Sequence, residues 1–164
     1  LRGMKGDAWE GGHRMPFITR WPNKIKANTT TDQTISFTDV MATLAAITET
    51  PLAKGDGPDS FNLLPVLTGQ QSENRAIRGP MVIPAGRNVM SIRSGPWKLI
   101  TILGSGGFSK PKFVKPVPGG PTAQLYNMES DKAETINVFL KHPDVVKRLQ
   151  AELADIQSAT QTRP

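Results

Sequence analysis

The chain has 164 residues, a formal net charge of +6, 37% hydrophobic residues and no cysteine. This length allows one ordinary domain with a buried core, and the missing cysteine excludes disulfides and a thiol nucleophile within the chain. No stretch approaches the roughly 18 apolar residues of a membrane span, and zinc-finger spacing, RNA-recognition aromatics and a basic helix before heptads are all missing, so we expect no nucleic-acid partner.

The first segment, residues 5–16, gathers charged residues around a glycine pair and has the sequence KGDAWEGGHRMP. Paired glycines allow positive φ and close approach of the backbone to another group. The apolar run at residues 17–21 follows at once and is interpreted as a buried strand that fixes this turn. Taken alone, the composition of these residues favours a solvated loop before a strand.

A helix is predicted after residue 35. Ser36 can cap it, and Asp39 stands at the position that completes a capping box. Thr50 precedes a proline and therefore disfavours helix, which ends the element there. Five apolar residues recur at helical spacing, and we expect this face to be core: Phe37, Val40, Met41, Leu44 and Ile47.

The second half of the chain predicts a small antiparallel sheet closed by a helix. A Gly-containing turn at residues 94–96 separates two β-prone runs, which is typical of a hairpin. Residues 104–121 contain five glycines and four prolines and predict a long loop. The expected strands lie at residues 81–83, 89–93, 97–103 and 124–127.

The last helix is expected to begin at Pro143, since proline suits the first helical position. Its apolar residues recur on one face, which we expect to pack on the sheet. The members of this face are Val145, Val146, Leu149, Leu153 and Ile156.

The order of these segments resembles the sulfatase family. In residues 5–22, a Lys, then Glu-Gly-Gly, Arg and Pro, precede an apolar run that ends in Arg-Trp-Pro. Further segments resemble the family in the same order and extend the resemblance over nearly the whole chain: 36–39, 59–65, 92–100, 125–127 and 131–137. The portion resembled is the C-terminal part of an arylsulfatase-like enzyme of the alkaline-phosphatase superfamily.

The resemblance implies a fold class and a domain division. Residues 1–79 would be the C-terminal end of the α/β catalytic domain, which is alkaline-phosphatase-like. Residues 80–164 would form a small α+β domain, with an antiparallel sheet of about four strands and a C-terminal helix. The chain would pack on the N-terminal part of the sulfatase domain. A chain that begins with Leu1 and not with Met is expected to be a fragment or a processed product.

Sulfatases use a formylglycine nucleophile, made within a Cys/Ser-x-Pro/Ala-x-Arg motif, and a Ca²⁺ ion held by Asp-Asp and Asp-Asn pairs. None of these motifs occurs in the sequence. The resemblance therefore implies that the nucleophile and the calcium ligands lie upstream, that this chain holds no metal ligand, and that the chain alone is inactive.

One family position that contacts the sulfate does carry over, because Lys5 matches the Lys that precedes Glu-Gly-Gly. An ammonium group there would offset negative charge on the ester oxygens; the alternative is a surface lysine. His13 stands at a variable position, where it would either line the substrate pocket or remain an exposed loop residue. Trp9 would either stack on a sugar or wedge the loop in place. Glu10 and Arg14 are expected to pair with each other or with the strand layer and so to hold the turn.

The function expected from the resemblance is hydrolysis of sulfate esters. The substrate is expected to be a sulfated carbohydrate, because residues 59–65 and 104–109 resemble bacterial sulfatases of that kind. The alternatives are a phosphomonoester or phosphonate hydrolase of the same superfamily and a non-catalytic module for anionic glycans, which the net charge would also suit. A periplasmic or extracellular location is implied by resemblance alone.

Overall fold

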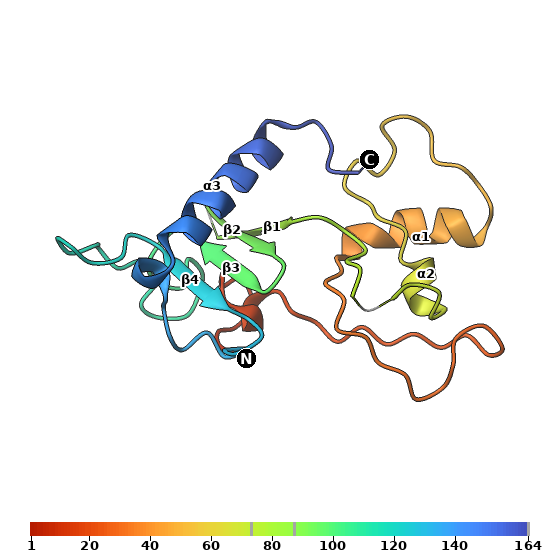
Figure 1. The fold of residues 1–164 in the computed structure, drawn as a ribbon, viewed down its shortest axis with the longest axis horizontal. Helices are drawn as coiled ribbons and strands as arrows, with labels where there is room; N and C mark the ends of the chain where they lie inside the picture. Colours follow the sequence, from red (N-terminus) through yellow and green to blue (C-terminus); the bar gives the residue numbers. More distant parts are fainter. Residues whose placement is uncertain (73, 87, 164) are drawn as a thin grey trace. The chain divides into compact units, whose positions relative to one another are not determined.

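The structure is a computed structural model that describes residues 1–72, 74–86 and 88–163 (Figure 1). The chain forms two compact units. The first combines residues 1–16 with 80–157, and the second combines residues 17–79 with the chain from Ser158 onward. We had expected two continuous segments divided at residue 79/80. In the structure, residues 1–16 pack with the later sheet, because the N-terminal segment covers one face of it. The division into a catalytic-domain end and a small C-terminal domain stays a prediction.

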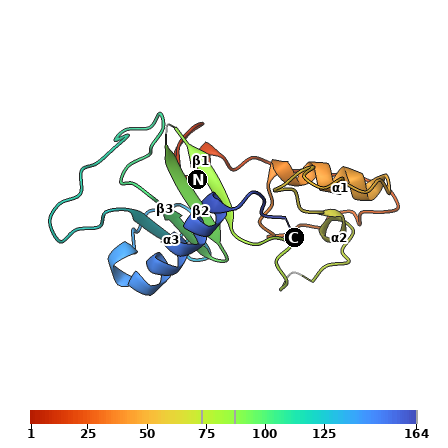
Figure 2. The same cartoon turned by 90° about the horizontal axis from the view of Figure 1, so that it is seen from above.

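The first unit is built on a four-stranded antiparallel sheet in the order β1-β2-β3-β4 (Figure 2). Each strand pairs with its sequence neighbour, and the hairpin between β2 and β3 confirms the turn predicted at residues 94–96. All four predicted strands are present, with β3 shorter than expected. The strands are β1 (Met81–Ala85), β2 (Val89–Ser94), β3 (Trp97–Ile100) and β4 (Gln124–Asn127).

One face of the sheet is covered by α3 (Pro143–Ser158), which follows a short 3-10 helix at Phe139–Lys141. Leu149 is fully buried on this face, and the predicted apolar side of α3 is confirmed. Because side chains alternate along a strand, every second residue faces α3. The core here contains Ile92, Leu99 and Leu125 from the sheet and Val146, Leu149 and Leu153 from α3.

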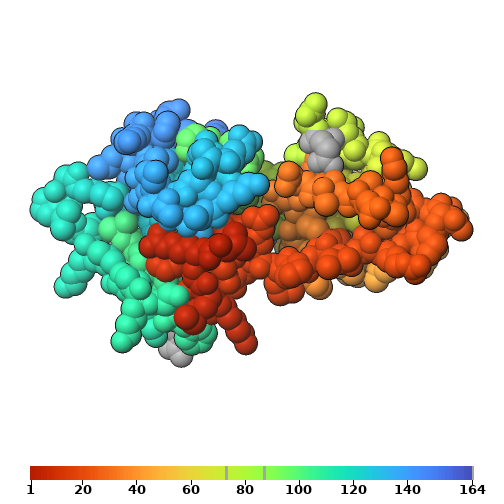
Figure 3. Space-filling view, turned by 90° about the horizontal axis from the view of Figure 1, so that it is seen from below, coloured from red at the N-terminus to blue at the C-terminus, as the bar shows by residue number. Residues whose placement is uncertain are grey.

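The opposite face of the sheet is covered by the N-terminal segment, which includes a 3-10 helix at Glu10–Gly12. Trp9 is buried there against strand residues that alternate along each strand with the residues facing α3. The sheet residues of this second core are Ala85, Val89, Ile100 and Tyr126. Figure 3 shows the red N-terminal segment lying against the blue segment that follows β4 and the teal loop that precedes it.

The second unit contains two short helices, α1 (Val40–Ile47) and α2 (Leu64–Leu67), with a 3-10 turn at Phe37–Asp39 ahead of α1. The predicted capping box is confirmed, since the Ser36 amide donates to Asp39 Oδ2 at 2.7 Å and the Ser36 side chain accepts from the Thr38 amide. Asp39 is also fully buried and accepts two 2.9 Å hydrogen bonds from Arg78.

Two expectations about this unit were wrong. Residues 17–21 form no strand, and Ile18 is 91% exposed. The expected core face of α1 is open as well, with Phe37 65%, Met41 47% and Leu44 55% exposed. A strand needs a neighbour for its N–H and C=O groups, and an apolar helix face needs a packed layer opposite it. Neither is provided by the described residues of this unit.

Among the described residues, no helix is both long enough and apolar enough to cross a membrane.

Leu149 tests the docking of α3, since its side chain is fully buried between helix and sheet. Leu149→Ala should lower the free energy of unfolding by about 2–5 kcal/mol, because it leaves a cavity in the core. The midpoint of urea denaturation measures this loss. Gln150→Ala, at the exposed neighbouring position, is the matched control. Equal midpoints for the two variants would contradict the docking.

Candidate functional site

Lys5 lies on a tight turn whose backbone is locked by Asp7. The Asp7 amide donates to the Met4 carbonyl at 3.0 Å, and the Met4 amide donates to Asp7 Oδ2 at 2.9 Å. Gly6 completes the turn with φ +85°, a region that favours glycine. The Lys5 side chain is exposed, and no described residue makes a hydrogen bond or ion pair with it. The turn therefore presents an unpaired ammonium group on a fixed backbone.

The glycine pair at positions 11 and 12 allows another part of the backbone to approach closely, and neither glycine has a positive φ. A Cβ on Gly12 would lie 2.0 Å from the Asp7 carbonyl oxygen, and one on Gly11 would lie 2.4 Å from the Gly3 carbonyl oxygen. Since the Gly11 amide also donates to the Arg2 carbonyl at 2.7 Å, the 3-10 helix is pressed against the turn that carries Lys5. No larger residue fits at either position.

A buried ion-pair cluster joins this segment to the sheet. Lys98 is fully buried, and its Nζ donates to Glu10 Oε1 at 2.9 Å and to Glu134 Oε1 at 2.8 Å. The second Glu134 oxygen accepts the Glu10 amide at 2.6 Å. Each carboxylate thus accepts a hydrogen bond from the lysine, and Glu134 also accepts one from a backbone amide. Charges can be buried without a large loss of stability only when they are paired and hydrogen-bonded in this way.

The cluster involves a side chain whose role the sequence analysis missed. Glu134 lies in the segment 131–137, which contributed only to the family resemblance, yet it is fully buried with φ +55°, an uncommon conformation for a residue other than glycine. Its carbonyl accepts from Arg2 at 2.7 Å. The available signal was Lys98, because strand alternation places it on the opposite face from Trp97 and Leu99, where a buried lysine requires a carboxylate.

His13 points into the same cluster. Its Nε2 lies 3.2 Å from Glu10 Oε1 and 3.4 Å from Lys98 Nζ, while its buried Nδ1 has no hydrogen-bond partner. The expected pairing of Arg14 with Glu10 is present at 3.7 Å. The predicted substrate contact of His13 remains a prediction, but one ring nitrogen is already engaged inside the protein.

Trp9 acts as a wedge and does not stack on a sugar. Its side chain is 3% exposed, and its Nε1 donates to Gln124 Oε1 at 3.0 Å. The Tyr126 hydroxyl donates to the same oxygen at 2.8 Å, and the Arg2 guanidinium lies 3.7 Å above the Trp9 ring. The residue that we considered as a possible sugar platform therefore holds the Lys5 segment onto β4.

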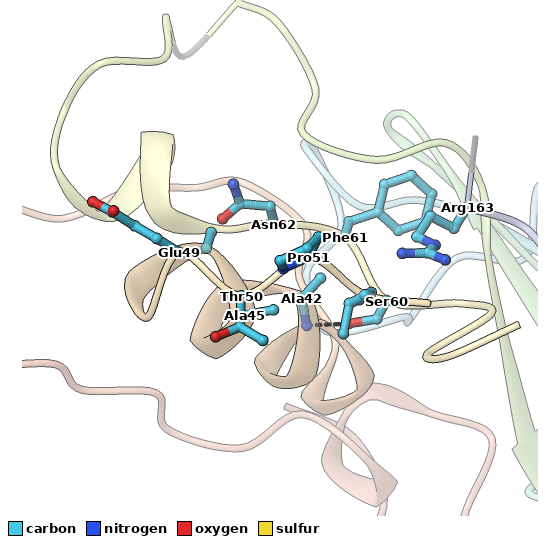
Figure 4. A pocket seen from close by; sticks show the side chains of 11 residues that line it. Ala42, Ala45, Glu49, Thr50, Pro51, Ser60, Phe61, Asn62 and Arg163 are labelled. Atoms are coloured by element: carbon cyan, nitrogen blue, oxygen red, sulfur yellow. Dashed lines mark hydrogen bonds between the residues drawn. The ribbon is translucent and has the colours of Figure 1, made fainter. Parts of the chain in front are cut away.

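A hollow in the second unit is separate from these residues (Figure 4). It lies between α1 and residues 60–62, and its wall includes Phe61 and Arg163. None of the residues predicted for the site belongs to it. In the part of the chain that the structure describes, no group of three or more His, Asp or Glu side chains is placed to hold a metal ion.

The charge of Glu10 makes the cluster sensitive to acid. Burial alone would raise the pKa of Glu10, but the His13 hydrogen bond and the Lys98 charge and hydrogen bond outweigh it and lower the pKa to about 2. A depressed carboxyl pKa stabilises the folded state above the unfolded pKa of 4.5. This contribution, about 3 kcal/mol by linkage, is lost as pH falls from about 4.5 to about 2.

Glu10→Gln should therefore flatten the fall of the unfolding free energy between these pH values, because the group that takes up the proton is gone. Urea titrations at a series of pH values measure the difference between variant and parent. Asp144→Asn, at an exposed carboxylate on α3, is the control and should leave the slope unchanged. Parallel curves for Glu10→Gln and the parent would show that Glu10 is not held charged by the cluster.

Comparison with known proteins identifies relatives of this chain, although no protein-family model matches it. N-acetylgalactosamine-6-O-sulfatase from Bacteroides thetaiotaomicron is 34% identical over 96% of this chain and 30% of its own length. Human arylsulfatase G is 26% identical over 93% of this chain and 30% of its own. A solved structure described under glycosaminoglycan metabolism by Bacteroides thetaiotaomicron has a TM-score of 0.79 and 33% identity, with 96% of this chain and 32% of that one covered.

These matches agree in their extent, since the chain spans about 30% of the length of the curated relatives it matches. The four-stranded sheet and its helix are common to this chain and the solved relative. The chain is therefore homologous to sulfatases, which are sulfuric ester hydrolases, and corresponds to a C-terminal portion of them.

Proposed function

We propose that this chain contributes a sulfate contact, Lys5, to a sulfatase that hydrolyses sulfated carbohydrates. The observation that carries the proposal is the exposed, unpaired Lys5 ammonium group on a turn locked by Asp7. An ammonium group beside the ester would stabilise negative charge on the sulfate oxygens as the bond to the leaving group breaks. Because the turn is already ordered, little reorganisation would accompany that interaction.

The buried cluster would serve this contact by fixing its position. Lys98 and Glu134 hold Glu10, and the glycine pair beside Glu10 contacts the Lys5 turn. We place the formylglycine nucleophile and the calcium ligands outside this chain, since the sequence contains no Cys/Ser-x-Pro/Ala-x-Arg motif and the described residues offer no metal cluster. No step of the reaction is assigned to residues of this chain other than Lys5.

The exposed apolar residues of α1 and of the 3-10 turn before it support a further part of the proposal. Phe37, Met41 and Leu44 would pack against the remainder of the α/β domain in the longer protein, where they would regain the core role that their spacing predicts. A carbohydrate substrate is supported by the N-acetylgalactosamine-6-O-sulfatase relative. The His13 contact is retained as a proposal, because 20% of its side chain remains exposed.

Lys5→Ala in the longer protein should lower kcat by about 100-fold or more, as does loss of a donor that stabilises transition-state charge. Lys5→Arg should restore part of the activity, because it keeps the charge but changes its shape and reach. Turnover of 4-nitrophenyl sulfate measures both effects. Lys132→Ala, at another exposed lysine of the first unit, is the control. A near-normal kcat in folded Lys5→Ala would return Lys5 to the role of a surface residue.

The purified 164-residue chain should not hydrolyse 4-nitrophenyl sulfate, because it contains no residue that we can assign as the nucleophile. The measurement compares release of 4-nitrophenol by the chain with release by a heat-inactivated sample. Turnover above that background would contradict the assignment of the nucleophile to the remainder of the protein.

A further inference from the structure

The long loop between β3 and β4 is joined at its base to the turn that carries Lys5. The Ala8 amide donates to the Ser105 carbonyl at 2.8 Å. Asp7 Oδ1 accepts from the amides of Phe108 and Ser109 at 2.7 and 3.0 Å. A Cβ on Gly107 would lie 2.2 Å from the Gly6 carbonyl oxygen. The two backbones are thus in contact, and no side chain separates them.

The loop also braces itself. The amides of Ser105 and Gly106 donate to the carbonyls of Pro111 and Lys112 at 3.0 and 2.9 Å. Several hydrogen bonds therefore hold residues 105–112 in place relative to the Lys5 turn. This ordered base contrasts with the long, loosely held loop that the glycine and proline content of the segment suggests.

This arrangement places an aromatic ring beside the Lys5 turn. The Phe108 ring lies next to Gly6, where a Cβ would be 3.1 Å from its Cε2, yet 65% of Phe108 remains exposed. The Lys112 Nζ lies 5.9 Å from the ring centroid. An exposed flat apolar surface and an ammonium group therefore adjoin the residue that we propose as the sulfate contact.

The charge around this ring is positive. Lys5, Lys110 and Lys112 are exposed, and the described residues form no ion pair with them. The carboxylate nearest in sequence, Asp7, is buried and occupied by backbone amides, which contribute to lowering its pKa against the opposing effect of burial. The surface fits a ligand with several negative charges and apolar faces between them.

We propose that Phe108 and Lys112 bind the sugar chain of a sulfated carbohydrate next to the sulfate that Lys5 contacts, an inference that rests on the proposed function. The C–H face of a sugar ring packs on the Phe108 ring, as apolar groups do on aromatic faces. Lys112 pairs with a second anionic group along the chain. The fixed base of the loop lowers the ordering cost of binding, so these two residues select longer sulfated chains over small esters.

The test compares two substrates in the longer protein: a tetrasaccharide containing 6-O-sulfated N-acetylgalactosamine, and 4-nitrophenyl sulfate. Phe108→Ala should lower the ratio of kcat/KM for the tetrasaccharide to that for the aryl ester about 10-fold, as loss of an aromatic contact does. Lys112→Gln should lower it about 3-fold, since the contact is exposed to solvent. Its effect should shrink as salt screens the charge.

Two substitutions elsewhere serve as matched controls and should leave the ratio at the parent value. Phe113→Ala removes another exposed ring from the same loop, and Lys147→Gln removes an exposed charge from α3. A ratio that stays at the parent value in Phe108→Ala and Lys112→Gln would overturn the inference. This outcome includes the case in which kcat/KM falls equally for both substrates, because the residues would then only support the Lys5 turn.

Calorimetric titration with the same tetrasaccharide separates this inference from the proposed function. If the parent hydrolyses neither substrate but binds the tetrasaccharide, and Phe108→Ala weakens that binding, the proposed function fails and the binding surface stands. A parent protein that does not bind the tetrasaccharide overturns the surface. A second result would also overturn the surface: the protein sediments with phosphatidylserine vesicles, and Phe108→Ala reduces this sedimentation but not tetrasaccharide binding. The ring would then contact a membrane.

Discussion

The burial of Lys98 between Glu10 and Glu134 is the interaction on which the first unit depends. It joins three segments that are far apart in the sequence: the N-terminal segment, β3 and the turn after β4. An isolated ammonium group at this depth would be strongly destabilising. The two carboxylates neutralise the charge of Lys98, and Glu134 also accepts a backbone amide, so the burial of Lys98 requires the three segments to meet.

Close backbone packing complements this ion-pair cluster. Gly12 lies against Asp7 and Gly107 lies against Gly6, so neither contact admits a side chain. Asp7 uses its two carboxylate oxygens to hold the Lys5 turn on one side and the long loop on the other. The result is a continuous layer of short segments with little regular structure, held by specific hydrogen bonds in place of a strand ladder. Such a layer can present side chains from two distant segments side by side.

The sheet separates the apolar core under α3 from the segment that carries Lys5. On one face, α3 packs its leucines and valines in an apolar core. On the other, Trp9 and Tyr126 converge on Gln124 and carry the N-terminal segment. Since strand residues alternate between the faces, the same four strands serve both. Substitutions on the α3 face should therefore act on stability, whereas those on the opposite face can also move the Lys5 turn.

The sequence by itself determined the local elements of the first unit, since strand alternation, the turn at residues 94–96 and the apolar side of α3 are short-range patterns. Motif order also predicted Lys5 as the sulfate contact, and that role stays a prediction. Only the tertiary structure decided that Glu134 completes the Lys98 cluster, that Trp9 is a wedge, and that Phe108 adjoins Gly6, because these contacts join segments that are 36 to 124 residues apart in the sequence. The predictions for residues 17–21 and for the apolar face of α1 were wrong for the same reason. The sequence pattern predicts burial in both places, but burial needs an opposing surface, and the described residues of their unit do not supply one.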